Sequence, residues 1–259
     1  MSKDHPTILV CNDDGILAPG IAALVEVARE FGTVVIVAPD SPQSGMGHAI
    51  TVGKPLRLYR VRTLFQDLEA YQTNGTPVDC VKMATQLVMD EKPDLLVSGI
   101  NHGSNSSINV LYSGTMSAAV EGALEGIPSI GFSLTNYSHD ADFSGAKYYA
   151  RIIIREALQE GVMGGVALNV NIPDLPKQEI RGIRVGRQAE AMWVDMYDKR
   201  QDPGGRDYFW VSGTFSNRDQ GEDTDEYALR NRYVSVVPVQ FDMTAHHAIS
   251  QLNQWNFGA

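Results

Sequence analysis

Two adjacent carboxylates follow a short apolar run near the N-terminus of the chain. The run covers residues 8–11 and is followed directly by Asn12, Asp13, Asp14 and Gly15. A continuous apolar run is typical of a buried parallel strand, and open α/β sheets bind their ligands at the carboxyl ends of such strands. Neighbouring carboxylates repel each other unless a positive charge lies between them, and hard divalent cations prefer oxygen ligands. The pair indicates a divalent cation site. The alternative is an Asp that caps the following helix.

A second polar loop, residues 39–48, follows the β-branched run 33–38. Parallel neighbours bring their C-terminal loops to one edge of a sheet, so Ser44, Gly45 and His48 are candidates for the same site. The alternatives are a turn in which the Ser44 hydroxyl bonds to its own backbone, and a structural role for His48.

A third loop, residues 98–105, follows the apolar run 95–97 and is rich in Gly and Asn. Glycine lets backbone approach a ligand closely, and the amide of Asn101 offers a neutral oxygen that a hard cation accepts. An ordinary Gly/Asn loop is the alternative.

Ser113, Gly114 and Thr115 open a predicted helix that runs to Glu125. The free N–H groups and the positive end of the dipole at a helix N-terminus favour phosphate, so we expect an anion pocket here. Simple N-capping by Ser113 or Thr115 is the alternative.

These residues require an alternating α/β framework. Apolar positions three and four apart predict a helix over 21–31, and together with the runs on either side it makes a βαβ unit. The later predicted helices cover 77–89 and 144–161, and the later predicted strands cover 128–134, 166–172 and 183–185. The segment 49–61 contains Pro55 and favours a hairpin or an edge strand.

The pattern of apolar and polar residues changes from about Gln188. The segment 207–213 alternates like a strand, 233–239 resembles a late strand, and His246 and His247 open a short helix. The acidic run 219–226 favours a solvated loop over a metal cluster. We therefore predict a core over 1–187 and an extension over 188–259. The extension lacks an obvious hydrophobic core of its own, so we expect it to pack against another subunit.

Composition excludes several classes of protein. The chain has 259 residues with a net charge of −10, which disfavours a nucleic-acid surface. Only Cys11 and Cys80 are present, so neither a disulfide framework nor a cysteine zinc site is expected. The absence of a signal-like N-terminus and of long apolar runs predicts a cytoplasmic protein that does not bind membranes.

The four motifs, in this order and spacing, closely resemble the SurE (survival protein E) family of nucleotidases. Supporting matches are Asn74-Gly75-Thr76-Pro77 and the late segments 223–225 and 233–236. The resemblance covers most of the chain and is dense over residues 8–134. It implies a Rossmann-like, three-layer, mostly parallel α/β sheet, and a C-terminal hairpin and helix exchanged between subunits of a homodimer or homotetramer.

The resemblance also implies an activity and a set of site residues. The activity is that of a 5′-nucleotidase, a hydrolase that converts nucleoside 5′- and 3′-monophosphates to nucleoside and phosphate with one divalent cation per subunit, Mg or Mn. Its metal ligands carry over to Asp13, Asp14, Ser44 and Asn101. Its phosphate site carries over to Ser113, Gly114 and Thr115, with Asn105 and with Gly45 beside it.

Elementary phosphoryl-transfer chemistry agrees with this activity. Catalysis of phosphate-ester hydrolysis is mainly positioning and charge neutralisation, and a divalent cation also lowers the pKa of a bound water. Asp13 or Asp14 holds the cation while the other orients or deprotonates that water, and Asn105 donates to the phosphate. Two alternatives remain, a phosphatase that uses Asp13 as a covalent nucleophile and a nucleotide-binding regulatory protein without turnover. The carboxylates are adjacent rather than spaced Asp-x-Asp, which disfavours the covalent route, and no GxGxxG follows the first strand.

Overall fold

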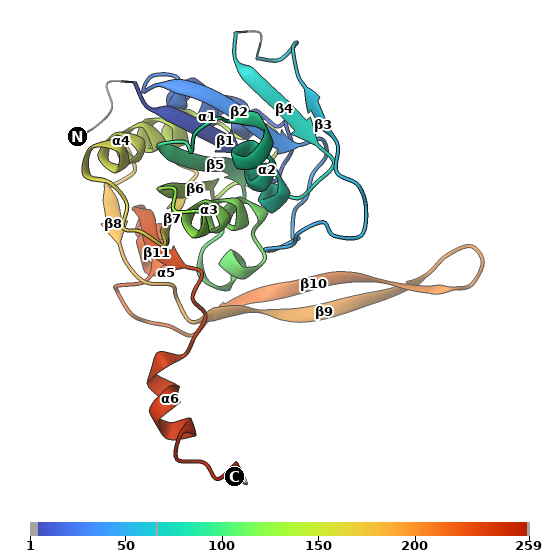
Figure 1. Cartoon of the computed structure of the whole chain (residues 1–259). Coiled ribbons are helices and arrows are strands. Elements are labelled where there is room, and N and C mark those ends of the chain that lie inside the picture. Colours follow the sequence, from blue (N-terminus) through green and yellow to red (C-terminus); the bar gives the residue numbers. More distant parts are fainter. Residues whose placement is uncertain (1–4, 66, 258–259) are drawn as a thin grey trace.

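Continuous apolar segments form the central strands of one large sheet (Figure 1). The computed structural model describes residues 5–65 and 67–257. Its buried inner strands are β1 (Thr7–Cys11), β2 (Thr33–Pro39), β5 (Leu95–His102), β6 (Ser129–Leu134) and β7 (Val166–Ile172). They are rich in branched aliphatic residues and covered on both faces, as parallel strands in α/β proteins must be.

The sheet has nine strands in the order β3-β4-β2-β1-β5-β6-β7-β11-β8. The remaining members are β3 (Leu58–Arg60), β4 (Glu69–Thr73), β8 (Ile183–Val185) and β11 (Val234–Gln240). Within this sheet, the β3–β4 and β7–β11 pairs are antiparallel, and the other pairs formed by the described residues are parallel. The mostly parallel sheet is confirmed, and β3 is an edge strand within the segment for which Pro55 favoured that position.

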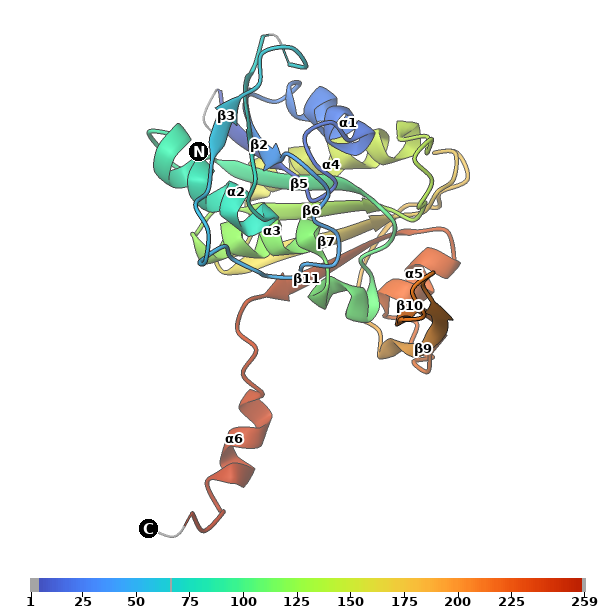
Figure 2. The same cartoon turned by 90° about the vertical axis from the view of Figure 1, so that its right-hand side faces the viewer.

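Helices cover both faces of the sheet, which confirms the three layers (Figure 2). Helices α1 (Pro19–Ala28) and α4 (Ser144–Glu160) pack together on one face, and α2 (Pro77–Met83) and α3 (Gly114–Leu124) pack together on the other. Helix α2 is shorter than expected because residues Ala84–Val88 form a wider π-helical turn, η1. A short 3-10 helix, η2 (Ser107–Leu111), precedes α3.

The C-terminal part contains both projecting and core elements. Strands β9 (Ala191–Gln201) and β10 (Asp207–Asn217) form a long hairpin, and α6 (His246–Leu252) stands away from the sheet (Figure 1). Strand β11 instead returns to the sheet between β7 and β8, preceded by α5 (Asp225–Arg230). The segment 188–259 therefore combines the expected hairpin and helix with a core strand that the sequence did not assign to the main sheet. Within residues 5–65 and 67–257, no helix is long and apolar enough to cross a membrane.

Candidate functional site

The three polar loops leave adjacent strands. Strand β1 lies between β2 and β5 and runs parallel to both, so the loops after them meet at one edge of the sheet. The amide of Gln43 donates to the carbonyl of Asp13 at 2.8 Å, and the amide of His102 donates to Oδ2 of Asp14 at 3.3 Å. The β2 and β5 loops are thus tied directly to the carboxylate pair.

Asp13 is buried and points at the start of α3. The residue is only 3% exposed, and its Oδ1 accepts a hydrogen bond from the hydroxyl of Thr115. Burial, followed by the charge of Asp14, raises the pKa of Asp13 to about 6, against the opposing effect of the hydrogen bonds from Thr115. The ionised form of Asp13 is therefore unfavourable in this site without a nearby positive charge, and a bound cation would supply that charge.

Asp14 is half-buried and lies next to a cavity. Burial raises the pKa of its carboxyl above the ordinary value, while the amide hydrogen bond from His102 opposes that shift. Two adjacent carboxyls with raised pKa values indicate a shared site rather than two independent surface acids.

Asn101 lies within β5, which continues to His102, so the expected loop over 98–105 begins later than predicted. The residues that follow Asn101 orient its side-chain amide. Its Nδ2 donates to the carbonyls of Gly103 at 2.8 Å and His102 at 3.2 Å. Both amide hydrogens are used, so Oδ1 is the atom left to bind a cation. The backbone conformation that leads to Asn101 requires glycine at position 99. Gly99 has a φ of +125°, and a Cβ there would lie 2.3 Å from the carbonyl oxygen of Phe132.

Ser44 and Gly45 lie exposed in the loop after β2, with Gly45 at a φ of +75°. His48, from the same loop, has its Nε2 2.8 Å from Oε2 of Glu121 on α3, and Lys82 also pairs with Glu121. The contact between His48 and Glu121 anchors the loop to α3 and favours the structural role for His48.

The donor set fits a hard cation bound mainly by oxygen. In the part of the chain that the structure describes, no three or more His, Cys, Asp or Glu side chains group into a metal site. The candidate ligands are instead two carboxylates, an amide oxygen and a hydroxyl, which suit Mg or Mn and leave positions for water and substrate.

The N-terminus of α3 faces Asp13. Ser113 caps the helix, accepting from the amide of Met116 at 3.0 Å, so the capping role expected as an alternative is present. A Cβ on Gly114 would lie 2.6 Å from Cβ of Asp13, so only glycine permits this approach. Thr115 uses its hydroxyl to hold Asp13, and the positive end of the helix lies beside the candidate cation site.

Asn105 is held by a network of buried amides. Its Nδ2 donates to Ser133 at 2.8 Å, its backbone amide donates to Oδ1 of Asn171 at 2.7 Å, and its carbonyl accepts from Asn169 at 2.8 Å. One amide hydrogen of Asn105 is left for a ligand. Asn169 and Asn171, on β7, were visible in the sequence as polar residues in a buried strand, but no role was assigned to them.

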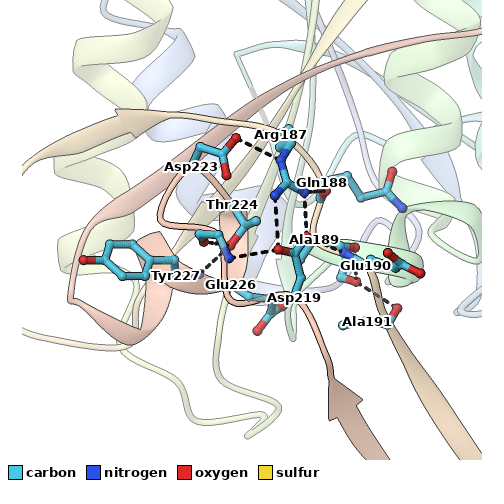
Figure 3. Close-up of polar contacts among 12 residues, drawn as sticks. Arg187, Gln188, Ala189, Glu190, Ala191, Asp219, Asp223, Thr224, Glu226 and Tyr227 are labelled. Carbon is cyan, nitrogen blue, oxygen red and sulfur yellow. Dashed lines mark hydrogen bonds and ion pairs between the residues drawn. The ribbon is translucent and has the colours of Figure 1, made fainter.

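The prediction of a solvated loop over 219–226 is right for its first part, where Glu222 and Asp223 are exposed, and wrong for its end, where Asp225 is buried and begins α5. Asp225 is fully buried and accepts from the amides of Ser107 at 2.7 Å and Ala189 at 2.9 Å. Arg187 pairs with Asp219 at 2.6 Å and with Asp223 at 2.9 Å (Figure 3). The run joins η2 to the base of the β9–β10 hairpin, because its carboxylates meet backbone amides and a guanidinium that composition alone does not reveal.

Sequence reasoning missed an aromatic wall beside Asp14. His102, Tyr137 and His139 line a cavity of about 390 Å³ together with Asp14 and with residues from the start of α1. The residues Tyr137 and His139 follow β6 at the same sheet edge, so the rule that brought the other loops together would have found them.

The comparisons with known proteins agree with this architecture. The model of the family described as survival protein SurE matches residues 8–195. A protein named 5′-nucleotidase SurE from Flavobacterium psychrophilum is 59% identical over 256 residues, covering 99% of each chain, and one from Christiangramia forsetii is 58% identical over 258 residues, with the same coverage. The crystal structure of the SurE protein from Aquifex aeolicus superposes with a TM-score of 0.83 at 39% identity, covering 96% of this chain and 98% of that one. The resemblance of the motifs is confirmed, and the chain belongs to the survival protein SurE family.

Proposed function

We propose that this chain is a metal-dependent 5′-nucleotidase, which hydrolyses nucleoside 5′- and 3′-monophosphates to nucleoside and phosphate. Membership of the family and the name shared by relatives at 57–59% identity support the activity. The observation that carries the proposal is the adjacent pair of buried Asp13 and half-buried Asp14, both with raised pKa values, with Asp13 in contact with the N-terminus of α3. This pair needs a cation, and the helix terminus beside it suits a phosphoryl group.

Asp13, Asp14, Ser44 and Asn101 would hold one divalent cation per subunit, Mg or Mn. When bound, such a cation neutralises phosphoryl charge and lowers the pKa of a coordinated water. The fit rests on the donor chemistry, because the Asn101 amide is already turned with Oδ1 free and the Asp13 carboxyl gains most from a positive neighbour.

The chain's own groups would position the phosphate and the attacking water. The backbone amides of Ser113, Gly114 and Thr115 at the start of α3 would donate to phosphoryl oxygens, and that of Thr115 also hydrogen-bonds to Asp13. The second amide hydrogen of Asn105 would donate to another phosphoryl oxygen. Gly45, with no side chain, would let the β2 loop approach the phosphate. We assign the orientation and deprotonation of water to Asp14, because it is less buried than Asp13 and borders the cavity.

Phosphate release from AMP tests the proposal. We expect adenosine and inorganic phosphate in equal amounts, no release in EDTA, and recovery on addition of Mg, Mn, Co or Ca with different efficiencies. Binding of AMP without release would support the regulatory alternative. Trapping of an aspartyl-phosphate on Asp13 would support the covalent alternative.

We also propose that the chain forms a homodimer or homotetramer through its C-terminal elements. Trp193, Trp210 and Phe209 on the hairpin are 42%, 60% and 56% exposed, and none of the residues of α6 is buried. Large exposed apolar side chains on projecting elements mark an interaction surface, and the same elements on a second copy would cover them. Light scattering on the intact chain that gives the mass of a monomer would contradict this.

We place the protein in the cytoplasm. Cys11 and Cys80 are both free and buried, which suits a reducing compartment. Fractionation of cells that express the chain tests the location, and recovery outside the cytoplasmic fraction would contradict it.

A further inference from the structure

The cavity beside Asp14 is built differently from the cation site. Its volume of about 390 Å³ falls in the range of small-molecule sites. Leu17 and Pro19 from the start of α1 contribute apolar surface, and Tyr137 and His139 contribute aromatic rings. The cavity therefore offers hydrophobic and aromatic walls right next to a carboxylate of the candidate catalytic site.

The charge of the lining argues against a second phosphate group. Asp14 and Asp40 are the charged residues among the described side chains that line the cavity, and no Lys or Arg lines it. An extended anion such as a diphosphate would be repelled here. An uncharged group with hydroxyls and an aromatic ring is the matching chemistry. Asp40 and Ser41 line the cavity and are joined by a hydrogen bond of 2.8 Å from the Ser41 hydroxyl to Oδ1 of Asp40, and the remaining carboxylate oxygen and the hydroxyl oxygen can accept hydrogen bonds from ligand hydroxyls.

The ring of Tyr137 packs on the backbone just after β5. A Cβ on Gly103 would lie 2.1 Å from Cε1 of Tyr137, so one side of the ring lies directly against the residue that follows β5. The residue is nevertheless 72% exposed. A ring that is supported on one side and open on the other is a platform for stacking.

The aromatic wall is connected to the cation site through His102. The ring Nδ1 of His102 lies 2.9 Å from the carbonyl of Ser138, and its backbone amide donates to Asp14. The rings of His102 and His139 meet edge to face at 6.1 Å between centroids. The position of the wall is therefore fixed relative to Asp14, as a site that binds both halves of one substrate requires.

We propose that this cavity binds the nucleoside part of the substrate, with Tyr137 as the stacking platform for the base and Asp40 and Ser41 at the ribose hydroxyls. This inference rests on the proposed nucleotidase function and assigns specificity-determining residues to it. The phosphate then lies between the cation site and α3, and the base lies across Tyr137.

The first test compares AMP with ribose 5-phosphate, which has the phosphate and sugar but no base. The ratio of kcat/KM for AMP to that for ribose 5-phosphate should exceed one in the wild type. Stacking of a base on an aromatic side chain contributes about 1–3 kcal/mol, so Tyr137→Ala should lower the ratio by about tenfold. Tyr137→Phe keeps the ring and should keep the ratio. Tyr59→Ala is the matched control, because Tyr59 is an exposed tyrosine on the edge strand β3.

The second test measures binding without turnover. Adenosine, which lacks phosphate, should show saturation-transfer NMR contacts with the wild type and Tyr137→Phe in EDTA, and weaker contacts with Tyr137→Ala. An unchanged activity ratio in Tyr137→Ala, with AMP still hydrolysed, would overturn the cavity assignment and leave the nucleotidase function intact. If no phosphate ester is hydrolysed, the proposed function fails, and adenosine binding that does not depend on Tyr137 overturns the cavity assignment separately.

Discussion

Thr115 donates its hydroxyl hydrogen to Oδ1 of Asp13, although 102 positions separate the two residues in the sequence. Thr115 is the second residue of α3, and Asp13 follows β1. One contact thus joins the carboxylate pair to the N-terminus of the helix that is expected to receive phosphate. A hydrogen bond to a metal-binding carboxylate fixes its orientation and favours its charged form.

Removal of that hydroxyl should weaken cation binding. Thr115→Val has nearly the same volume but cannot donate, so Asp13 loses its orientation and its pKa rises further. The Mn concentration for half-maximal phosphatase activity should rise by about tenfold or more, in line with the loss of other outer contacts to metal ligands. Thr115→Ser keeps the donor and should behave like the wild type. Equal Mn requirements for the valine variant and the wild type would show that the contact has no such role.

The raised pKa of Asp13 predicts a pH-dependent cost to the metal-free fold. A carboxyl whose pKa rises from 3.8 to about 6 on folding stabilises the fold at low pH, and this contribution is lost as the pH rises through 6. The side chain that Asp13→Asn introduces does not ionise, so the variant does not lose this contribution. In EDTA, the unfolding free energy of the variant minus that of the wild type should therefore rise by on the order of 1 kcal/mol from pH 5 to pH 8. Urea unfolding at both pH values measures this. Parallel pH dependences of the two proteins would refute the prediction.

Asp225 should be important for stability although it lies in an acidic run. Asp225→Ala would leave the buried amides of Ser107 and Ala189 without an acceptor, which should cost about 3 kcal/mol in urea unfolding. Asp223→Ala is the matched control, because the Asp223 side chain is 68% exposed and its ion pair with Arg187 is screened by solvent and should contribute little to stability. Similar losses in the two variants would contradict a buried structural role for Asp225.

Asn171 should position Asn105 for catalysis. Its Oδ1 accepts from the Asn105 amide and, at 3.2 Å, from the hydroxyl of Ser104. Asn171→Leu removes both contacts, and kcat for AMP should fall by about tenfold while the Mn requirement stays the same, since this loss concerns the phosphate side of the site. A raised Mn requirement with kcat unchanged would instead connect Asn171 to the cation ligands.

The framework of the fold was predictable because its signals are local. The apolar runs 8–11, 33–38 and 95–97 have the continuous hydrophobicity of buried strands, and they form β1, β2 and the start of β5. Once those strands are parallel neighbours, the meeting of their loops follows from topology, which is why Asp13 and Asn101 could be grouped from sequence.

Other features depend on contacts between distant segments and could not be predicted in this way. Asp225 looked solvated because the sequence does not show the amide of Ser107, 118 residues away, that it accepts from. Strand β11 looked like a late extension, yet it enters the sheet antiparallel to β7, a pairing that no local pattern encodes. Tyr137 is a different case, because topology places the loop after β6 at the same sheet edge, but no motif in that loop marked the residue.

The most direct test of the central claim measures Mn binding and AMP hydrolysis together in Asp13→Asn. The wild type should bind about one Mn per chain by equilibrium dialysis and release phosphate from AMP. Asp13→Asn should stay folded by circular dichroism but lose Mn binding and nearly all phosphate release, and Asp90→Asn, an exposed control, should keep both. Near-normal hydrolysis of AMP by Asp13→Asn in the presence of Mn would contradict the assignment of the carboxylate pair as the metal centre of a phosphatase.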